Sequence, residues 1–359
     1  MSNLHELRLA RPVLITGGAG FLGANLADRL ARAGVPVRVL DSLARPNVER
    51  NLAWLKQRHD GMVSAFIADV RDTGAVEEAV RDAGAVFHLA AQVAVTTSVA
   101  DPVDDFEINA RGTLNLLEAL RRRSDPPPLL FASTNKVYGQ LFEEAELERV
   151  DDRWQPRDPE AARGCDERTP LDFHSPYGCS KGVADQYVLD YARVFGLPTV
   201  VFRMSCLYGP RQFGTEDQGW IAHFLLRAME NRPITLFGDG CQVRDALFVD
   251  DAVDAWLTAW QQLDRVRGRA FNLGGGPEHS LSLRELLYRL EELTGVAPRL
   301  EFCDARPGDQ LWYVSDCSAL TAATGWKPRT GLDEGLECLA GWLAAGLVDP
   351  SPERVSIPA

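Results

Sequence analysis

A tyrosine and a lysine four positions apart are the first residues in this chain that could carry out acid–base chemistry. Tyr177 and Lys181 stand in "SPYGCSKG", and their spacing places both on one face of a helix. A phenol in water ionises near pH 10, but a neighbouring ammonium stabilises the phenolate and makes it usable as a base. The pair therefore predicts proton transfer at a hydroxyl, although the same spacing alone is also typical of a solvated helix face.

The stretch "FASTNKVYG" places polar side chains where an apolar strand ends. The first residues of this stretch are apolar and predict a buried strand. Thr134, Asn135 and Lys136 follow that strand directly. In an open parallel sheet such a strand end faces the ligand crevice. Thr134 can therefore hydrogen-bond the same reacting oxygen as Tyr177. For Asn135 and Lys136 the alternative is simple strand-end polarity.

A glycine-rich turn, "TGGAGFLG", follows the first predicted strand and opens a helix. Gly17 and Gly20 lack Cβ atoms, so backbone N–H groups and the positive helix end can approach a pyrophosphate. Asp41 closes the second strand about 20 residues on, where a carboxylate can accept ribose hydroxyls. That charge repels a 2′-phosphate and favours NAD over NADP, whereas Arg45 nearby favours the opposite. Asp69, which ends the third strand, is either an adenine contact or an exposed turn residue.

Strands alternate with helices along the first part of the chain. Apolar runs such as "VPVRVLDSL", "AVFHLAA" and "PTVVFRMS" are separated by stretches with helical spacing such as "TGAVEEAVRDAG" and "SKGVADQYVLDYARVFG". This order predicts an α/β fold, a Rossmann doubly wound parallel sheet with helices on both faces. We expect an NAD-binding domain over residues 1–208. Residues 209–359 should form a smaller mixed α/β substrate-binding lobe, with segments that return to the first domain.

The segment 140–175 interrupts this alternation. It is rich in charged residues and proline and has no sustained period. A segment of this length inside a compact domain is more often a functional cover or disordered than an idle connection. We expect a solvated surface loop, with a substrate lid as the alternative.

Composition and charge exclude several classes of protein. The 359 residues are 45% hydrophobic and 25% charged, as in ordinary globular proteins. A net charge of −13 opposes binding to nucleic acid, which depends on clustered Lys and Arg contacts to phosphate. The seven cysteines are scattered without a CxxC pair, so we expect neither a disulfide framework nor a metal site. Without a signal-peptide core or a membrane-length apolar run, we expect no membrane partner and a cytoplasmic location.

Taken together, these motifs resemble the extended short-chain dehydrogenase/reductase family of nucleotide-sugar enzymes, the NAD-dependent epimerases and dehydratases. The resemblance runs from about residue 11 to residue 342 and includes "HLAA", "NARGTLNLLEA", YxxxK and "YGPRQ". It implies that Tyr177 takes a hydroxyl proton while NAD takes the hydride from the same carbon, with Lys181 and Thr134 assisting. The residues that it implies for NAD binding are Gly17, Gly20, Phe21, Leu22, Asp41, Asp69, Val70, Leu89, Ala90, Ala91, Asn109, Tyr177 and Lys181.

The two positions after the catalytic threonine select within this family. In the 4,6-dehydratase members they carry an acid and a base, typically Asp and Glu, whereas this chain has Asn135 and Lys136. An amide cannot protonate a leaving hydroxyl and a charged lysine is a poor base, so loss of water is disfavoured. The stretches "STNKVYG", "SPYGCSKG" and "RPGDQLWYVSD" are similar instead to the CDP-tyvelose (CDP-paratose) 2-epimerase branch.

This second resemblance implies inversion at C2 of a nucleotide-diphosphate sugar, by transient oxidation to a keto-sugar and return of the hydride from tightly held NAD. A UDP-sugar 4-epimerase is the main alternative, because it would use the same Thr134, Tyr177 and Lys181. A nucleotide-sugar dehydratase and a non-catalytic NAD-binding protein are less favoured. Cys206 departs from the Asn that many members carry before "LYG", which weakens the analogy to 4-epimerases more than to 2-epimerases.

Arginines of the second lobe are the expected partners of the substrate's diphosphate. Guanidinium groups match phosphate oxygens geometrically, and the resemblance implies this role for Arg244 and Arg306, and more weakly for Arg211. The alternative is a surface ion pair with Asp245 or Asp309. The complete predicted substrate-binding set is Gln92, Asn135, Lys136, Arg211, Arg244 and Arg306.

The helices predicted at 109–120 and 177–191 both carry long apolar stripes. In isolation such a stripe indicates core packing. Members of the family commonly pair these two helices into a four-helix dimer interface. The resemblance therefore implies a homodimer, with a homotetramer as the alternative.

Overall fold

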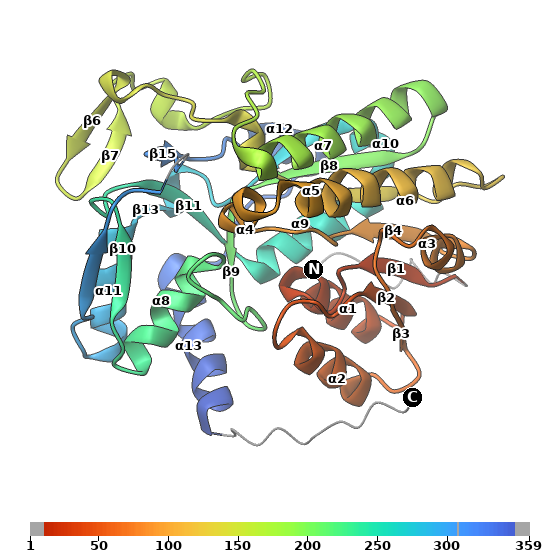
Figure 1. The fold of residues 1–359 in the computed structure, drawn as a ribbon, viewed down its shortest axis with the longest axis horizontal. Coiled ribbons are helices and arrows are strands. Elements are labelled where there is room, and N and C mark those ends of the chain that lie inside the picture. The colour runs from red at the N-terminus through yellow and green to blue at the C-terminus, as the bar shows by residue number, and fades with distance from the viewer. Residues whose placement is uncertain (1–10, 307–308, 349–359) are drawn as a thin grey trace.

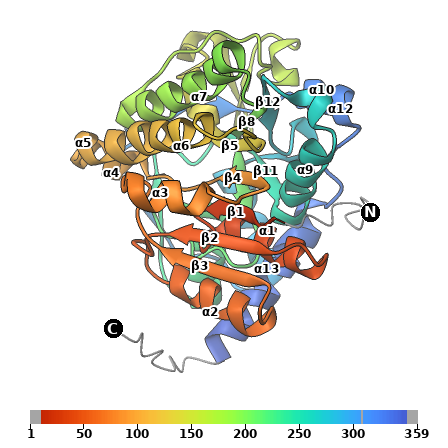
Figure 2. The ribbon, with the colours of Figure 1, turned by 90° about the vertical axis from the view of Figure 1, so that its right-hand side faces the viewer.

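The structure is a computed structural model and describes residues 11–306 and 309–348. Seven strands form a central sheet in the order β12-β8-β5-β4-β1-β2-β3, and every neighbouring pair is parallel. Figure 2 shows these strands one above another from β3 to β12. The strands are β1 (Val13–Thr16), β2 (Val37–Asp41), β3 (Val63–Ile67), β4 (Ala85–His88), β5 (Leu129–Thr134), β8 (Thr199–Met204) and β12 (Arg269–Leu273).

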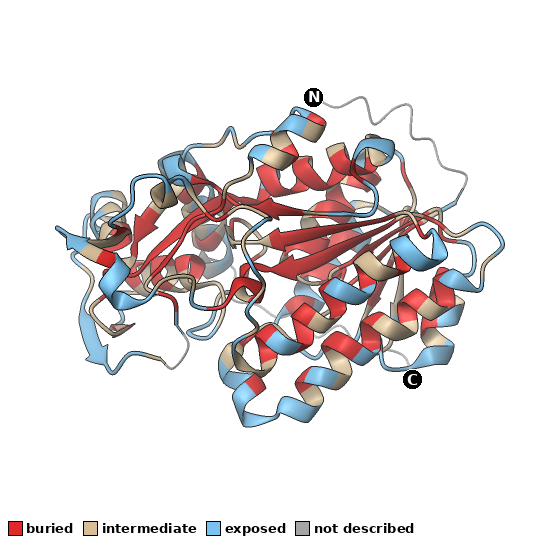
Figure 3. Cartoon of the chain, turned by 90° about the horizontal axis from the view of Figure 1, so that it is seen from above, coloured by how far each residue is buried: buried red, intermediate tan, exposed pale blue. Residues whose placement is uncertain are grey.

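Helices cover both faces of this sheet, because its strands are apolar on both sides (Figure 3). Val13 and Ile15 of β1 pack into one core, while Leu14 between them packs into the other. The first core includes helices α1 (Phe21–Arg32), α2 (Val48–Arg58) and α9 (Val249–Gln261), and the second includes α3 (Thr73–Val80), α6 (Gly112–Arg121) and α7 (Ser175–Phe195). The predicted doubly wound Rossmann fold is confirmed. Helix α2 was not among the predicted elements.

The strand order reverses between β1 and β4, and this reversal fixes where ligands bind. β1 pairs with β2 on one side and with β4 on the other. The chain leaves these strands in opposite directions, so the loops at their carboxyl ends separate and open a crevice. The glycine turn follows β1, and Thr134 ends β5, which is the next strand beyond β4. Cofactor and reaction residues thus lie along the same edge of the sheet.

The segment between β4 and β5 is not one continuous helix. The sequence predicts a helix over 109–120, but the structure has α4 (Val95–Ala100), α5 (Pro102–Phe106), a π-helical turn over Glu107–Arg111 and then α6. Such π turns interrupt helices mostly at functional sites. This one brings Asn109 into the polar network described below.

The segment 140–175 is more ordered than predicted. It contains the hairpin of β6 (Leu147–Val150) and β7 (Arg153–Pro156), with short 3₁₀ turns at Glu144–Glu146 and Ala161–Arg163. Leu147 and Trp154 pack against Val243 and Trp312 of the second lobe, and the Trp154 indole donates to Asp239 at 3.1 Å. These buried contacts are why a polar, aperiodic stretch folds as a hairpin on the second lobe.

The second lobe is mixed α/β and smaller than the first (Figure 1). Its central strand β11 (Val243–Phe248) pairs with β13 (Ser280–Ser282), β15 (Trp312–Tyr313) and β9 (Cys206–Tyr208), while β10 (Ile234–Phe237) pairs with β14 (Leu300–Cys303). The strand β12 returns to the first sheet. The remaining helices after β9 are α8 (Trp220–Met229), α10 (Leu263–Val266), α11 (Leu283–Thr294), α12 (Ser318–Thr324), α13 (Leu332–Val348) and a 3₁₀ turn at Pro277–His279.

Candidate active site

The three predicted catalytic residues converge in the interior, where α7 packs on β5. The helix begins at Ser175, has a proline in its first turn, and ends at Gly196 in the left-handed conformation with φ 72°. Tyr177 and Lys181 lie on its buried face, and Thr134 ends β5. The Lys181 ammonium donates to the Ala132 carbonyl at 2.6 Å and lies 4.3 Å from the ring centroid of Phe131.

Burial acts on both titratable groups of this centre. It raises the pKa of Tyr177 to about 12, and the neighbouring Thr134 side chain opposes that rise. It lowers the pKa of Lys181 to about 7, against the raising effects of Asp185 and Asp105. In both cases the charged form is disfavoured because it is removed from water. Tyr177 can act as a base only if a positive charge stays beside it.

Asn135 and Lys136 open a 3₁₀ turn directly after β5 and reach towards the second lobe. The Lys136 ammonium donates to the Gln310 side-chain oxygen at 3.1 Å, and the Asn135 amide approaches the same oxygen at 3.4 Å. Burial lowers the pKa of Lys136 to about 8, and Arg244 nearby adds to that effect. Gln310 was not predicted as a site residue, because only the fold brings it to Asn135 and Lys136.

Arg244 is buried beside Lys136, and the two cations share one carboxylate. The Arg244 guanidinium lies 2.6 Å from Asp309, whose carboxylate is 3.8 Å from the Lys136 ammonium. Burial would raise the pKa of Asp309, but Arg244 and Lys136 hold it below its ordinary value. Two positive charges against one negative charge leave a positive excess, which suits an anionic ligand. Asp245, the other predicted ion-pair partner, accepts from Ser205 instead.

Arg306 and Arg211 lie in different surroundings. Arg306 is 3.3 Å from Glu216 and 3.5 Å from Asp217, on the second lobe. Arg211 stacks 3.7 Å from the ring centroid of Trp54 on α2, in the first domain. Burial lowers the pKa of the Arg211 guanidinium to about 10. The described contacts of Arg211 are thus separate from those of Arg244 and Arg306.

The glycine turn forms a cradle that leaves no room for side chains. Gly17 has φ 69°, and a Cβ there would lie 2.7 Å from the Ala90 nitrogen. Gly20 precedes α1 without any side-chain cap, and the first turn, which starts at Phe21 and Leu22, carries no acidic residue. The uncapped N–H groups and the positive helix end therefore fit the pyrophosphate of a dinucleotide.

Two aspartates stand at the carboxyl ends of the next strands. Asp41 accepts from the Ala19 and Leu43 backbone nitrogens, each at 2.9 Å, so it lies against the glycine turn, and burial raises its pKa. This position fits a ribose contact. Asp69 pairs with Arg71 at 2.8 Å, and that hydrogen-bonded partner lowers its pKa. Its neighbour Val70 is buried against α6.

The loop of residues 89–92 lies between the glycine turn and the π turn. Leu89 donates to the Thr16 carbonyl at 3.0 Å, and the Ala90 nitrogen donates to the Thr16 hydroxyl at 3.2 Å. Asn109 holds the other end, because its side chain accepts from the Gln92 nitrogen at 2.9 Å and donates to the Gln92 carbonyl at 3.0 Å. The strand-end residues 89–91 thus border the crevice at the switch between β1 and β4.

The Gln92 side chain, which the sequence predicts to bind substrate, is engaged by protein groups. Its amide donates to Asp105 and to the Ala94 carbonyl, each at 2.8 Å. Asp105 did not stand out in the sequence, because an aspartate near a helix start is read as a cap or as a solvated residue. In the structure it is 1% exposed.

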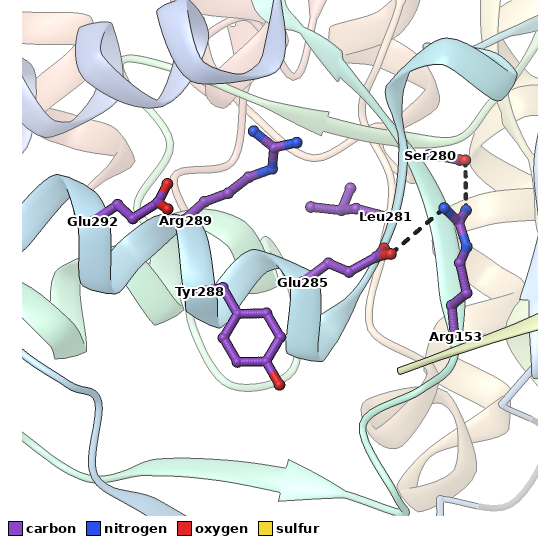
Figure 4. Close-up of a pocket in the computed structure, with 7 residues that line it drawn as sticks. All are labelled: Arg153, Ser280, Leu281, Glu285, Tyr288, Arg289 and Glu292. Atoms are coloured by element: carbon purple, nitrogen blue, oxygen red, sulfur yellow. Dashed lines mark hydrogen bonds and ion pairs between the residues drawn. The ribbon is translucent and has the colours of Figure 1, made fainter. Parts of the chain in front are cut away.

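A separate hollow of about 370 Å³ lies on the second lobe, away from these residues (Figure 4). Arg153 from the hairpin crosses it, donating to Ser280 at 2.8 Å and pairing with Glu285 at 3.5 Å. Arg289, which also lines it, pairs with Asp333 outside the hollow. Among the described residues there is also no group of three or more His, Cys, Asp or Glu side chains that could hold a metal ion.

Comparison with known proteins gives consistent results. Residues 13–274 match the model of the NAD dependent epimerase/dehydratase family. The chain is 44% identical to a CDP-paratose 2-epimerase of Salmonella typhi over 340 residues, which cover 93% of this chain and 99% of that protein.

Two solved structures share the fold. A UDP-glucose 4-epimerase of Thermus thermophilus in complex with NAD has a TM-score of 0.78 and 34% identity, covering 93% of this chain and 99% of that one. A UDP-glucose 4-epimerase of Thermotoga maritima with UDP-glucose has a TM-score of 0.79 and 30% identity, covering 94% and 99%. With the family model and the relative 44% identical, these likenesses show that the chain belongs to the NAD dependent epimerase/dehydratase family, with NAD as its cofactor.

Proposed function

We propose that this protein is an epimerase that inverts C2 of a nucleotide-diphosphate sugar. The observation that carries the proposal is the pair Asn135 and Lys136, fixed by Gln310 directly after the catalytic Thr134. An amide cannot supply the acid that water elimination needs for its leaving hydroxyl, which favours oxidation and hydride return as the chemistry. The 44% identity to a CDP-paratose 2-epimerase supports C2 as the position.

The chain's own residues handle the proton of this reaction. Tyr177 would take the proton of the substrate's C2 hydroxyl, with Thr134 hydrogen-bonded to the same oxygen. Lys181, in its ammonium form, lowers the energy of the phenolate. When bound along the glycine turn, Asp41 and the loop of residues 89–91, NAD supplies the hydride acceptor and donor. The buried position of Tyr177 keeps bulk water from the reacting carbon.

The positive excess beside Asp309 would hold the anionic end of the substrate. Arg244 is the principal candidate, because it is buried and one of its guanidinium nitrogens donates to a carboxylate that a phosphate could replace. Arg306 lies on the same lobe and would join it. For Asp69 and Asn109 we keep the predicted role in binding NAD. We place Arg211 and Gln92 outside direct substrate contact, since Trp54 and Asp105 already engage them.

A panel of CDP-, UDP-, GDP- and dTDP-sugars, followed by NMR, tests the function. We expect inversion at C2 with a CDP-sugar and no 4-keto-6-deoxy product. Inversion at C4 of a UDP-sugar would instead show the 4-epimerase activity named for the relatives from Thermus thermophilus and Thermotoga maritima. Formation of a 4-keto-6-deoxy product would show a dehydratase.

We further propose that the protein is a homodimer, or a pair of such dimers, formed through α7 and its neighbours. Large apolar side chains of α4, α5 and α7 are exposed on this part of the first domain. They are Val99, Val103, Phe106, Tyr187, Val194 and Phe195. Light scattering after gel filtration should give twice or four times the monomer mass. A monomer at micromolar concentration would contradict the proposal.

The location of the protein in the cell stays a prediction of the sequence. Among the described residues, no helix is both long and apolar enough to cross a membrane. All seven cysteines are free thiols in the structure. The reducing cytoplasm that the sequence predicts is where fractionation of the producing cell should find the protein.

A further inference from the structure

Asp105, the carboxylate that binds Gln92, is buried beside the catalytic helix without a cationic partner. One oxygen accepts from the Gln92 amide at 2.8 Å and from the Asn109 amide at 3.2 Å, and the other accepts from the Ser180 hydroxyl at 2.5 Å. All three donors are neutral. Among the described residues, the Asp105 carboxylate forms no ion pair. A carboxylate that is buried and only neutrally bonded keeps a large uncompensated field.

Lys181 is the cation on which the negative charge of Asp105 acts. It follows Ser180, the residue that donates to Asp105, and its ammonium otherwise contacts only a carbonyl and an aromatic face. Burial lowers the pKa of Lys181, and Asp105 is one of two carboxylates that oppose the change. Conversely, burial raises the pKa of Asp105, and Lys181 is the one cation that lowers it.

The other carboxylate, Asp185, already forms an ion pair with a different cation. Its two oxygens are 3.0 Å from two nitrogens of Arg203, and this bidentate pair is almost fully buried. Asp185 still has the larger raising effect on the pKa of Lys181, and Asp105 adds a second negative charge that is not paired with a cation in the described part of the chain. The remaining titratable groups near Lys181 are Tyr177 on its own helix and His88 on β4, and burial lowers the pKa of His88 to about 3, so it is neutral.

We propose that Asp105 is the counter-charge that keeps Lys181 in its ammonium form, and thereby keeps Tyr177 able to act as a base. Asp105 acts through Lys181 and does not touch the reacting atoms, so it is a positioning residue for charge. The π turn after α5 serves this arrangement, because it lets Asn109 and Asp105 join one network with Ser180. Only the benefit to Tyr177 rests on the proposed function.

The test variant Asp105→Asn removes the charge and can keep every contact. The amide oxygen would accept from Gln92 and Asn109, while the amide nitrogen would donate to Ser180. The Ser180 hydroxyl would then donate to the Tyr177 carbonyl, which lies 3.2 Å away. Glu107→Gln is the matched control, because Glu107 lies two residues further on the same segment and its side chain is 41% exposed beside Arg111.

NMR of the lysine side chains measures the protonation of Lys181 directly and needs no substrate. The chain contains only four lysines, Lys56, Lys136, Lys181 and Lys327, so a protein labelled with ¹³C at lysine Cε gives four signals. Lys181→Met identifies the Lys181 signal. In the NAD-loaded protein, Asp105→Asn should lower the Lys181 titration midpoint by about one pH unit or more, and Glu107→Gln should leave it in place. An unmoved midpoint in Asp105→Asn would overturn the proposal.

The pH profile of turnover provides the second readout. Lys181 supports Tyr177 only while protonated, so activity is present below its pKa and is lost as the pH rises through it. The alkaline limb of kcat/KM should therefore move to lower pH in Asp105→Asn by the shift seen in the NMR titration. A lower rate with an unchanged limb would show that Asp105 has a purely structural role. If no nucleotide sugar turns over, the function fails while the NMR result still decides the role of Asp105.

Discussion

Two buried carboxylates flank Lys181, and they are satisfied in opposite ways. Asp185 lies one turn along α7 and forms a bidentate ion pair with Arg203, whose guanidinium also donates to Tyr138 at 3.1 Å. Asp105 lies on α5 and has only neutral donors around it. The first arrangement ties α7 to β8, and the second leaves a negative charge for Lys181.

We infer from this difference that Asp185 stabilises the fold, whereas Asp105 controls the protonation state of Lys181. Removing one partner of a buried ion pair leaves the other charge unpaired, which is strongly destabilising. Replacing Asp105 by an amide of the same shape keeps its hydrogen bonds, and Lys181 can release its proton instead of remaining as an unpaired buried charge. We therefore expect stability to depend on Asp185 and catalysis to depend on Asp105, and the following experiments test that division.

Tyr177→Phe should give the largest effect, because it removes the hydroxyl that we propose as the base. Turnover should fall by about 10²–10⁴-fold, the usual contribution of a general base, while the fold and bound NAD remain. Steady-state kinetics and the absorbance of extracted NAD measure the two quantities. Near-normal turnover in this variant would place the base elsewhere.

Asp185→Asn should cost about 3–5 kcal/mol of unfolding free energy, because Arg203 is left buried without its partner. Urea unfolding followed by circular dichroism measures the change. Asp190→Asn on the same helix is the control, since Asp190 forms only an exposed pair with Arg193 at 3.5 Å and should change stability by less than about 1 kcal/mol. Equal losses of unfolding free energy in the two variants would contradict a structural role for the Asp185–Arg203 ion pair.

Much of the site could be predicted because its residues belong to local patterns. The strand end at Thr134, the spacing of Tyr177 and Lys181, and the glycine turn are each written in a few consecutive residues. The order of strands and helices then determines which edge of the sheet they share. The fold and the NAD site follow from such patterns, and both were predicted.

The residues that sequence analysis missed are those whose partners are distant in the chain. Gln310 meets Lys136 across 174 positions, and Ser180 meets Asp105 across 75. Their residue types carry no period or motif, so only packing assigns them a role. The phosphate role that its motif suggested for Arg211 stays a prediction, and its described contact is with the ring of Trp54.

Lys181→Met should change how stability depends on pH. The pKa of Lys181 is about 7 in the folded chain and near 10.4 in an unfolded one, so the unfolded state binds more protons between these values. The wild-type protein should therefore gain stability relative to the variant as the pH rises from 7 to 9, by about 1 kcal/mol per unit. Urea titrations at three pH values measure this, and the exposed Lys56→Met should show a flat difference.

Asp105→Asn should have the smallest effect on stability, a change below about 1.5 kcal/mol, because each lost charge–dipole contact is replaced by a neutral hydrogen bond. Urea unfolding beside Asp185→Asn measures the contrast. A loss as large as that of Asp185→Asn would show that the two carboxylates do not divide their roles as described.

The central claim, C2 inversion by hydride return without elimination, is tested most directly with a CDP-sugar deuterated at C2. The product should keep deuterium at C2 with inverted configuration, even in ordinary water, because a hydrogen that leaves and returns as hydride does not exchange with solvent. NMR and mass spectrometry of the product read both features. Deuterium lost to solvent, or deuterium retained at an uninverted C2 while C4 inverts, would contradict the account.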